Sequence, residues 1–283
     1  MGCVAQADGY APFKSFQAFT SALPATCRGY FFARKSDGSI AVFAGTSTNL
    51  YILDNTTFTW SNVSKGGGPY STLVTSDNWQ FRQFNDLVIA VQVNTAPQKY
   101  SLSGGGTFVD LLGSPPQASH IAIINRFVVL TGLLSNANRV QWSDLDAPET
   151  WTAGVGLSDF QDLPDGGTCH GISGGDAYGL VFQDEPIRSF VYAPGSPVTF
   201  QITRISQQDP IYAQYSVIEA GGRVFFLSAQ GFKMVQPGGV PTPIAKERID
   251  RFFFRDVDQA NLQLIIGAAD PTSTRVYWAY KSK

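Results

Sequence analysis

The chain has 283 residues, of which 20 are Lys or Arg and 22 are Asp or Glu, so its formal net charge is −2. This balance argues against a protein that holds nucleic acid through a global basic field. Charged residues make up 15% of the chain and aromatic residues 13%, and the charged share is low for a soluble domain. Such depletion is typical of surfaces buried between subunits and also of one large β core.

The chain contains no apolar run long enough for a transmembrane helix, and residues 1–8 lack the basic start and apolar stretch of a signal peptide. We therefore expect synthesis in a cytoplasm and no membrane span. Cys3, Cys27 and Cys169 are scattered, and their spacing predicts neither a disulfide framework nor a metal site. Reduced thiols are the default expectation.

A short apolar strand recurs along the chain, with steps of 47, 40, 51, 45 and 40 residues between successive centres. The six anchor strands are Ile40–Phe43, Leu87–Ala90, Phe127–Leu130, Tyr178–Val181, Val224–Leu227 and Leu264–Ile266. A second strand follows each of them, at Leu50–Leu53, Gln98–Leu102, Arg139–Trp142, Ile187–Tyr192, Phe232–Val235 and Arg275–Tyr280. The anchor strands are nearly all apolar, as for inner strands covered on both faces, whereas Arg139–Trp142 and Phe232–Val235 alternate like half-buried strands.

A period of about 40–50 residues with about four short strands is the size of a propeller blade. The sequence therefore predicts an all-β fold, a β-propeller of about six blades, as a single domain over residues 1–283. A β-sandwich, whose turns come every 8–12 residues or so without a larger period, and a mixed barrel are the competing architectures.

Helix is expected only in a short insertion near 245–262. Ala245–Phe254 follows Pro243 and carries Ile249, Phe252 and Phe253 at helical spacing, which predicts a helix of about three turns. Asp258–Leu262 is expected to form a further helical turn between two blades.

Catalytic chemistry finds little support in the histidines and cysteines. His120 and His170 are the two histidines, and neither has a metal-binding spacing. Cys169 and His170 are neighbours, so in a strand their side chains point to opposite faces and do not form a nucleophilic pair. Gly104–Gly106 lacks the Lys and the helix of a phosphate-binding loop. We expect no catalytic residues, no cofactor and no metal.

Three further clusters leave alternatives open. Acidic loops at Asp144–Asp146 and Asp159–Asp165 could ligate Ca²⁺, although such residues more often cap turns. Trp142 and Trp151 near the first loop are the cluster that a carbohydrate-binding or receptor-binding propeller would use. A propeller glycoside hydrolase would require two carboxylates facing each other across a central pocket. Basic residues near the predicted helix form either a solvated face or a contact for a partner subunit; they are Arg248, Arg251 and Arg255.

Several stretches, taken in order, resemble one family. They are Asp8–Pro12 with Ala22–Pro24, Phe43–Thr46 with Leu50–Tyr51, Trp79–Phe81 with Asn85–Ala90 and Ala96–Gln98, Arg139–Ser143 with Pro148–Trp151, Asp162–Gly167, and Gly179–Gln183. Together they are similar to the tail hub or nozzle proteins of tailed bacteriophages, also called packaged-DNA stabilisation proteins. The resemblance runs from about residue 8 to residue 280.

The resemblance implies a structural virion protein rather than an enzyme: a propeller subunit of a sixfold ring at the distal end of the tail. Such a ring continues the DNA channel, helps to retain and release the genome, and contacts the tail adaptor and a fibre or needle. It implies transient, non-specific contact with passing DNA, which fits the near-neutral charge. It also implies that relatives extend beyond Lys283 and before the opening motif.

Overall fold

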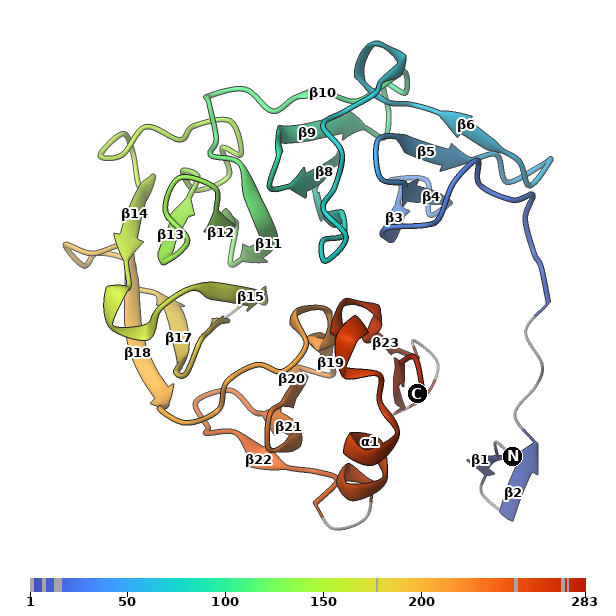
Figure 1. The fold of residues 1–283 in the computed structure, drawn as a ribbon. Coiled ribbons are helices and arrows are strands. Elements are labelled where there is room, and N and C mark those ends of the chain that lie inside the picture. The colour runs from blue at the N-terminus through green and yellow to red at the C-terminus, as the bar shows by residue number, and fades with distance from the viewer. Residues whose placement is uncertain are drawn as a thin grey trace.

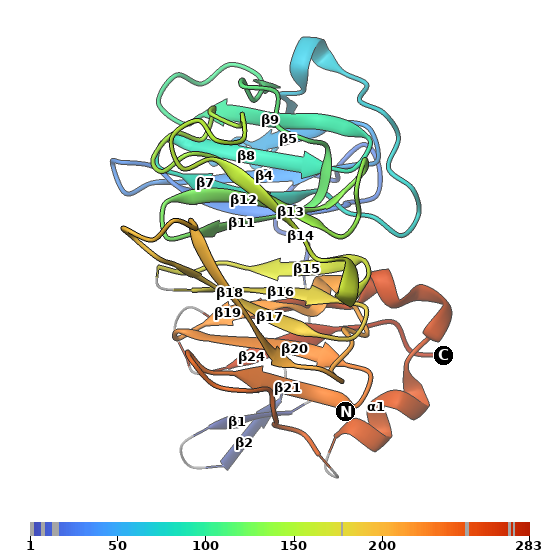
Figure 2. The same cartoon turned by 90° about the vertical axis from the view of Figure 1, so that its left-hand side faces the viewer.

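The computed structural model describes residues 3–6, 9–12, 17–176, 178–246, 249–270, 273 and 275–283. Within these residues, the strands form five four-stranded sheets and two two-stranded sheets, all antiparallel. The sheets stand around a common axis like blades (Figure 1), and from the side they appear as stacked layers (Figure 2). The prediction of an all-β propeller is confirmed.

Blades one to three occupy the first half of the chain. Blade one is formed by β3 (Tyr30–Arg34), β4 (Ile40–Gly45), β5 (Leu50–Leu53) and β6 (Trp60–Asn62), and the 3-10 turn η1 (Lys65–Gly67) follows it. Blade two is formed by β7 (Gln80–Phe84), β8 (Leu87–Gln92), β9 (Thr95–Ser101) and β10 (Val109–Asp110). Blade three is formed by β11 (Ala118–Ile124), β12 (Phe127–Leu133), β13 (Arg139–Trp142) and β14 (Asp159–Asp162).

Blades four to six occupy the second half of the chain. After η2 (Pro164–Gly166), blade four is formed by β15 (Cys169–Ser173), β16 (Gly179–Gln183), β17 (Ile187–Tyr192) and β18 (Phe200–Ser206). After η3 (Gln214–Ser216), blade five is formed by β19 (Ile218–Ala220), β20 (Arg223–Ser228), β21 (Gly231–Val235) and β22 (Thr242–Pro243). The helix α1 (Asp250–Asp256) and η4 (Gln259–Leu264) lead to blade six, which is formed by β23 (Ile266–Ala269) and β24 (Val276–Ala279).

Each four-stranded blade follows the same chain path. The first strand lies nearest the axis, the order in the sheet is the order in the chain, and the outermost strand leads to the first strand of the next blade. Each of the first five anchor strands predicted from the sequence overlaps the second strand of its sheet, so one strand separates it from the axis. The anchor strands are therefore interior to the sheets without being innermost. The sixth differs, because Leu264 ends η4 and the strand begins at Ile266.

Hydrophobic clusters fill the five interfaces from blade one to blade six. Each cluster joins one face of a blade to the facing side of the next blade. Between blades one and two, for example, the rings of Phe31 and Phe81 stack with their centroids 6.1 Å apart. Face-to-face packing of this kind explains why the second strands are almost wholly apolar: both of their faces are covered.

The helical insertion is present, but its details differ from the prediction. The helix α1 begins at Asp250 instead of Ala245; Glu247 and Arg248 lie outside the described residues. The carboxylate of Asp250 accepts a hydrogen bond from the backbone N–H of Phe232, which fixes this residue to blade five. Phe253 is buried, whereas Ile249 and Phe252 are each 56% exposed. The predicted apolar face thus lies partly toward solvent.

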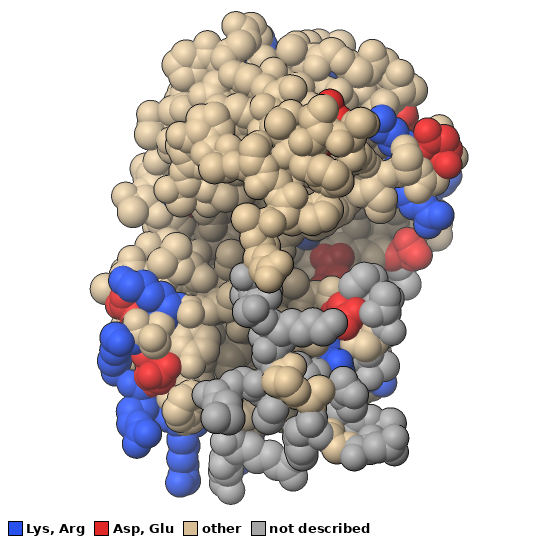
Figure 3. Space-filling view, turned by 90° about the vertical axis from the view of Figure 1, so that its right-hand side faces the viewer, with Lys and Arg blue, Asp and Glu red and all other residues tan. Residues whose placement is uncertain are grey.

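Blade six and blade one flank an open seam. The face of β3 and β4 that points away from blade two carries Tyr30, Phe32 and Ile40, which are 50%, 59% and 45% exposed. The face of blade six that points away from blade five carries Ile266 and Tyr277, which are 44% and 38% exposed. Figure 3 looks at this side of the molecule, and much of its upper part is free of charged side chains.

A separate hairpin lies at the open side of the ring. The strands β1 (Cys3–Gln6) and β2 (Gly9–Pro12) pair with each other and stand apart from blade six in Figure 1. Residues 17–29 lead from this hairpin to β3 along blade one, where the indole N–H of Trp60 donates to the backbone oxygen of Ser21 over 3.1 Å.

Candidate functional site

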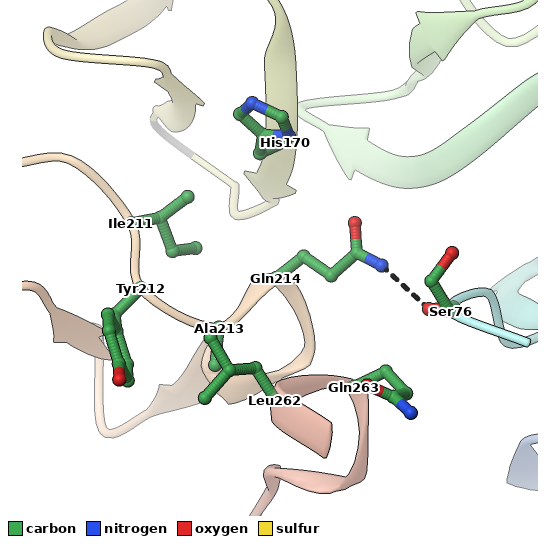
Figure 4. Close-up of a pocket in the computed structure, with 8 residues that line it drawn as sticks. All are labelled: Ser76, His170, Ile211, Tyr212, Ala213, Gln214, Leu262 and Gln263. Carbon is green, nitrogen blue, oxygen red and sulfur yellow. Dashed lines mark hydrogen bonds between the residues drawn. The ribbon is translucent and has the colours of Figure 1, made fainter. Parts of the chain in front are cut away.

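The centre of the propeller holds a cavity of about 280 Å³. It is lined by Ser76, His170, Ile211, Tyr212, Ala213, Gln214, Leu262 and Gln263 (Figure 4). These residues come from the connection between blades one and two, from β15, from the connection that includes η3, and from η4. Loops between blades, rather than the blades themselves, therefore build most of the cavity wall.

Hydrogen bonds across the axis hold these loops together. The side-chain amide of Gln214 donates to the backbone oxygen of Ser76 over 3.0 Å, as the dashed line in Figure 4 shows. The backbone N–H of Asn78 donates to the phenolic oxygen of Tyr215 over 2.8 Å, and its side chain reaches the backbone oxygen of Gln263 at 3.5 Å. Distant parts of the chain are thus joined by hydrogen bonds beside the cavity.

His170 lines the cavity and pairs with a carboxylate. Its Nε2 lies 2.6 Å from Oδ1 of Asp184, at the start of the turn between β16 and β17. Ser76 lines the same cavity, but its hydroxyl donates to Asp77, and the side chain of Gln214 lies between Ser76 and His170 in Figure 4. A nucleophile activated by a base requires direct contact between the two side chains, and this arrangement does not provide it.

Cys169 and His170 lie at a register shift of β15 and have different surroundings, because Cys169 is buried in the core and His170 pairs with Asp184. Cys169 is buried between blades three and four, and burial raises the pKa of its thiol to about 11. Such a thiol is a poor nucleophile at neutral pH. His120 is buried in β11, and burial lowers its pKa to about 3, with smaller contributions from His170 and Arg82. It is therefore a neutral core residue at physiological pH.

The carboxylates expected in a glycoside hydrolase are not found at this cavity. Among the described residues that line it, none is Asp or Glu. Hydrolysis of a glycosidic bond needs two carboxyl groups on either side of the substrate. This cavity therefore does not support that alternative.

The acidic loops form turns and ion pairs. Oδ1 of Asp144 accepts the backbone N–H groups of Leu145 and Leu157, each over 2.8 Å. Asp162 pairs with the guanidinium of Arg139 at 2.7 Å, and this hydrogen bond lowers the carboxyl pKa. No group of three or more His, Cys, Asp or Glu side chains suited to a metal ion occurs in the described part of the chain.

The two tryptophans of the suggested sugar site are core residues. Trp142 and Trp151 are 4% and 3% exposed. Their indole N–H groups donate to the backbone oxygens of Leu157 and Pro148 over 2.9 and 2.8 Å. Neither ring offers an exposed surface for a sugar, so this pair does not form the site that the sequence suggested.

The basic cluster near the helix is only partly described. Arg251 and Arg255 are exposed on α1, and Arg248 lies outside the described residues. Basic side chains gather at the lower left of Figure 3, at the end of the molecule that holds α1. No helix in the described residues is long and apolar enough to cross a membrane.

Several polar side chains form pairs that the sequence alone did not predict, because the partners lie far apart in the chain. Lys233 and Asp209 form a buried ion pair, and Asp165 accepts from both Arg188 and Arg204. Gln214 and Tyr215 meet residues 76–78 only because the blades stand around a common axis. No local motif marks such residues.

Comparisons with known proteins support the fold. No protein-family model matches the chain, and no curated protein matches it. A functionally unknown protein from Desulfotomaculum acetoxidans DSM 771 is similar with a TM-score of 0.53 and 15% identity, over 83% of this chain and 74% of that chain. At this identity the likeness shows a common fold alone.

Two further solved structures are more distant. Dihydro-heme d1 dehydrogenase NirN in complex with DHE has a TM-score of 0.46 and 13% identity, over 82% of this chain and 47% of that chain. BamB from Moraxella catarrhalis has a TM-score of 0.46 and 14% identity, over 80% of this chain and 61% of that chain. The present chain thus spans less than two thirds of either protein.

Proposed function

We propose that this chain is a structural virion protein, a subunit of the sixfold ring that forms the tail nozzle or hub of a tailed bacteriophage. In this role it acts by assembly rather than catalysis. The ring continues the DNA channel and helps to retain and release the genome. The ordered resemblance of its motifs to this family, together with the propeller fold, supports the proposal.

The motif residues have a structural explanation as well. Phe43, Trp79, Trp142 and Phe182 belong to motifs on four different blades, and all four are buried. Motifs of this kind preserve the packing between blades. By themselves these residues therefore support the propeller fold.

The observation that carries the proposal is the character of the surface. Large apolar side chains are exposed in several places outside the seam, including Leu134 at 58%, Val198 at 55% and Phe252 at 56%. Charged residues are scarce in the chain. Surfaces with few charges and exposed apolar groups are typical of contacts between subunits. None of the described residues that line the central cavity is Asp or Glu.

The same role sets expectations for partners and location. The subunits would contact copies of themselves, the tail adaptor and a fibre or needle protein, in the virion tail after synthesis in the host cytoplasm. Contact with DNA would be transient and non-specific. A net charge of −2 fits such a role, since each added Lys–phosphate contact would retain the DNA more strongly.

Electron microscopy and sedimentation of the full chain test the proposal. We expect rings with sixfold symmetry at high protein concentration, and density for this protein at the distal tail of the parent particle. A particle that stays monomeric at all concentrations, and labelling of the parent particle anywhere but the tail, would overturn the proposal.

A further inference from the structure

We propose that the N-terminal hairpin β1–β2 completes blade six by pairing with the outer edge of β24, and thereby closes the propeller. The inference concerns the fold of a single subunit and is independent of the proposed role in a phage tail. It rests on an open sheet edge, two facing apolar surfaces and the path of the chain.

The open edge belongs to β24. Its inner side pairs with β23 from Ile266↔Ala279 to Ala269↔Val276, and no strand of the described residues pairs with its other side. Each of the preceding five blades has two more strands at the corresponding place. An exposed strand edge presents unpaired N–H and C=O groups and is a ready acceptor for another strand.

The seam lacks the apolar packing found at every other interface. Gly267 and Trp278 face blade five, where the indole N–H of Trp278 donates to the backbone oxygen of Ser216 over 2.9 Å. The opposite face leaves Ile266 and Tyr277 exposed. Across the seam, Tyr30 and Phe32 are exposed on blade one. Arg34 ends the same face of β3, but the side chains nearer the middle of both faces are apolar. These apolar side chains look toward the same gap and are stabilised when a complete blade fills it.

The path of the chain identifies the hairpin as the occupant. In every connection from a four-stranded blade, the outermost strand leads to the innermost strand of the next blade. The strand that leads to β3 is β2. With β1 in third place and β2 in fourth place, blade six would follow the same rule. The connection 13–29 is as long as the connection 63–79, which spans the corresponding distance from β6 to β7.

The sequence of the hairpin fits these positions. Neither Cys3–Gln6 nor Gly9–Pro12 contains a charged residue, as expected for strands that enter an apolar seam. Pro12 has no backbone N–H to donate, and proline in sheets is confined to edge strands, strand starts or bulges. This favours β2 as the outermost strand and β1 as the partner of β24.

Cross-linking through Cys3 tests the pairing directly. In a Cys27→Ser background, Tyr277→Cys and Ala279→Cys place a thiol on the seam face of β24, and Leu134→Cys serves as an exposed control elsewhere. We expect one of the two β24 variants to form a disulfide with Cys3 within one chain, because paired strands bring Cα atoms within the range of about 4.4–6.8 Å that disulfides need. The control should form none.

Mixing isotopically labelled and unlabelled chains separates pairing within a chain from exchange between copies. If disulfides formed only between chains, the hairpin of a second copy would pair with β24, and the inference of closure within one chain would be overturned. Absence of any disulfide to Cys3 at both positions would overturn it altogether.

Hydrogen exchange on the unmodified chain gives a second measurement that needs no variant. We expect amides throughout Val276–Ala279 to be protected, and deletion of residues 2–12 to accelerate their exchange at least tenfold while Gly231–Val235 stays protected. Fast exchange of alternate β24 amides in the full chain would contradict the closure.

Thermal unfolding of two variants gives a third measurement. Phe32 and Phe252 are similarly exposed, but only Phe32 faces the seam. Closure therefore predicts that Phe32→Ser lowers the melting temperature of monomeric samples more than Phe252→Ser does.

Discussion

The phenolic oxygen of Tyr215 accepts a hydrogen bond from the backbone N–H of Asn78 over 2.8 Å, although 137 positions separate the two residues. The bond joins η3, which precedes blade five, to the connection between blades one and two. It is therefore a contact that only the assembled ring can make.

Tyr215→Phe removes this acceptor and leaves a backbone N–H without its partner. We expect the free energy of unfolding to fall by about 1–3 kcal/mol. Urea unfolding measures the loss, and hydrogen exchange should accelerate at residues 74–79. Tyr192→Phe is the control: it removes a hydroxyl group but keeps the ring, which packs against Phe127 and Phe200. An equal loss in both variants would show that the Asn78 contact adds nothing.

The buried imidazole of His120 makes stability depend on pH. Its pKa is about 3 in the folded chain and about 6.5 in an unfolded one. Between these values the unfolded state binds more protons, so stability falls as pH drops, by up to about 1.4 kcal/mol per pH unit. We expect His120→Phe to flatten the dependence between pH 6.5 and pH 4. An unchanged slope in the variant would assign the dependence to other groups.

Lys233 and Asp209 form an ion pair in which both side chains are about nine-tenths buried. Lys233→Met leaves the Asp209 carboxylate without its counterion, and we expect a loss of about 3–5 kcal/mol. The double variant with Asp209→Leu should recover most of this loss, since an apolar pair carries no buried charge.

Lys65 and Asp110 provide the matched control for that pair, because their side chains are 51% and 45% exposed. Lys65→Met should change stability by less than about 1 kcal/mol. Thermal and urea unfolding of the three variants would settle the comparison. Similar losses of stability for Lys233→Met and Lys65→Met would contradict the expectation that burial makes the Lys233–Asp209 pair the more costly one to break.

The exposed face of α1 is where we expect a subunit contact. Phe252→Asp introduces a charge into an apolar position that is 56% exposed, and it should raise the dissociation constant of the assembly about tenfold or more. The monomer fold should stay intact. Val240→Asp, at a residue 63% exposed on a turn of blade five, is the control. Sedimentation of both variants measures the effect, and unchanged assembly for Phe252→Asp would exclude this face.

The repeat of apolar strands was enough to predict the propeller. Residues such as Val88 and Val129 are covered on both sides, and this condition leaves a run of apolar residues that is visible in the sequence. The sixth repeat was misplaced by a few residues, because Leu264 ends η4 and Ile265 packs in the cluster between blades five and six before the strand begins.

The candidate site was harder to predict, since its residues come together only where the connections between distant blades meet at the axis. Asp144 caps backbone N–H groups, as acidic residues in loops often do, whereas Asp162 and Asp165 pair with arginines that the sequence did not connect to them. Trp142 ends a strand and Trp151 lies in a loop, and neither could be assigned to core or surface, because burial depends on which face meets the neighbouring blade. Gln214 and Ser76 carry no local pattern that would connect them.

The bridge from Gln214 to Ser76 also limits what can pass through this molecule. With Asn78 and Gln263 meeting beside it, the axis of the individual propeller is crossed by side chains and backbone. A rod as wide as a nucleic-acid duplex cannot thread the blades themselves. If copies of this chain surround DNA, the bore must therefore lie between subunits and be bounded by outer blade surfaces. The diameter of such a passage would then be set by how many copies assemble, and it would be independent of how many blades each contains.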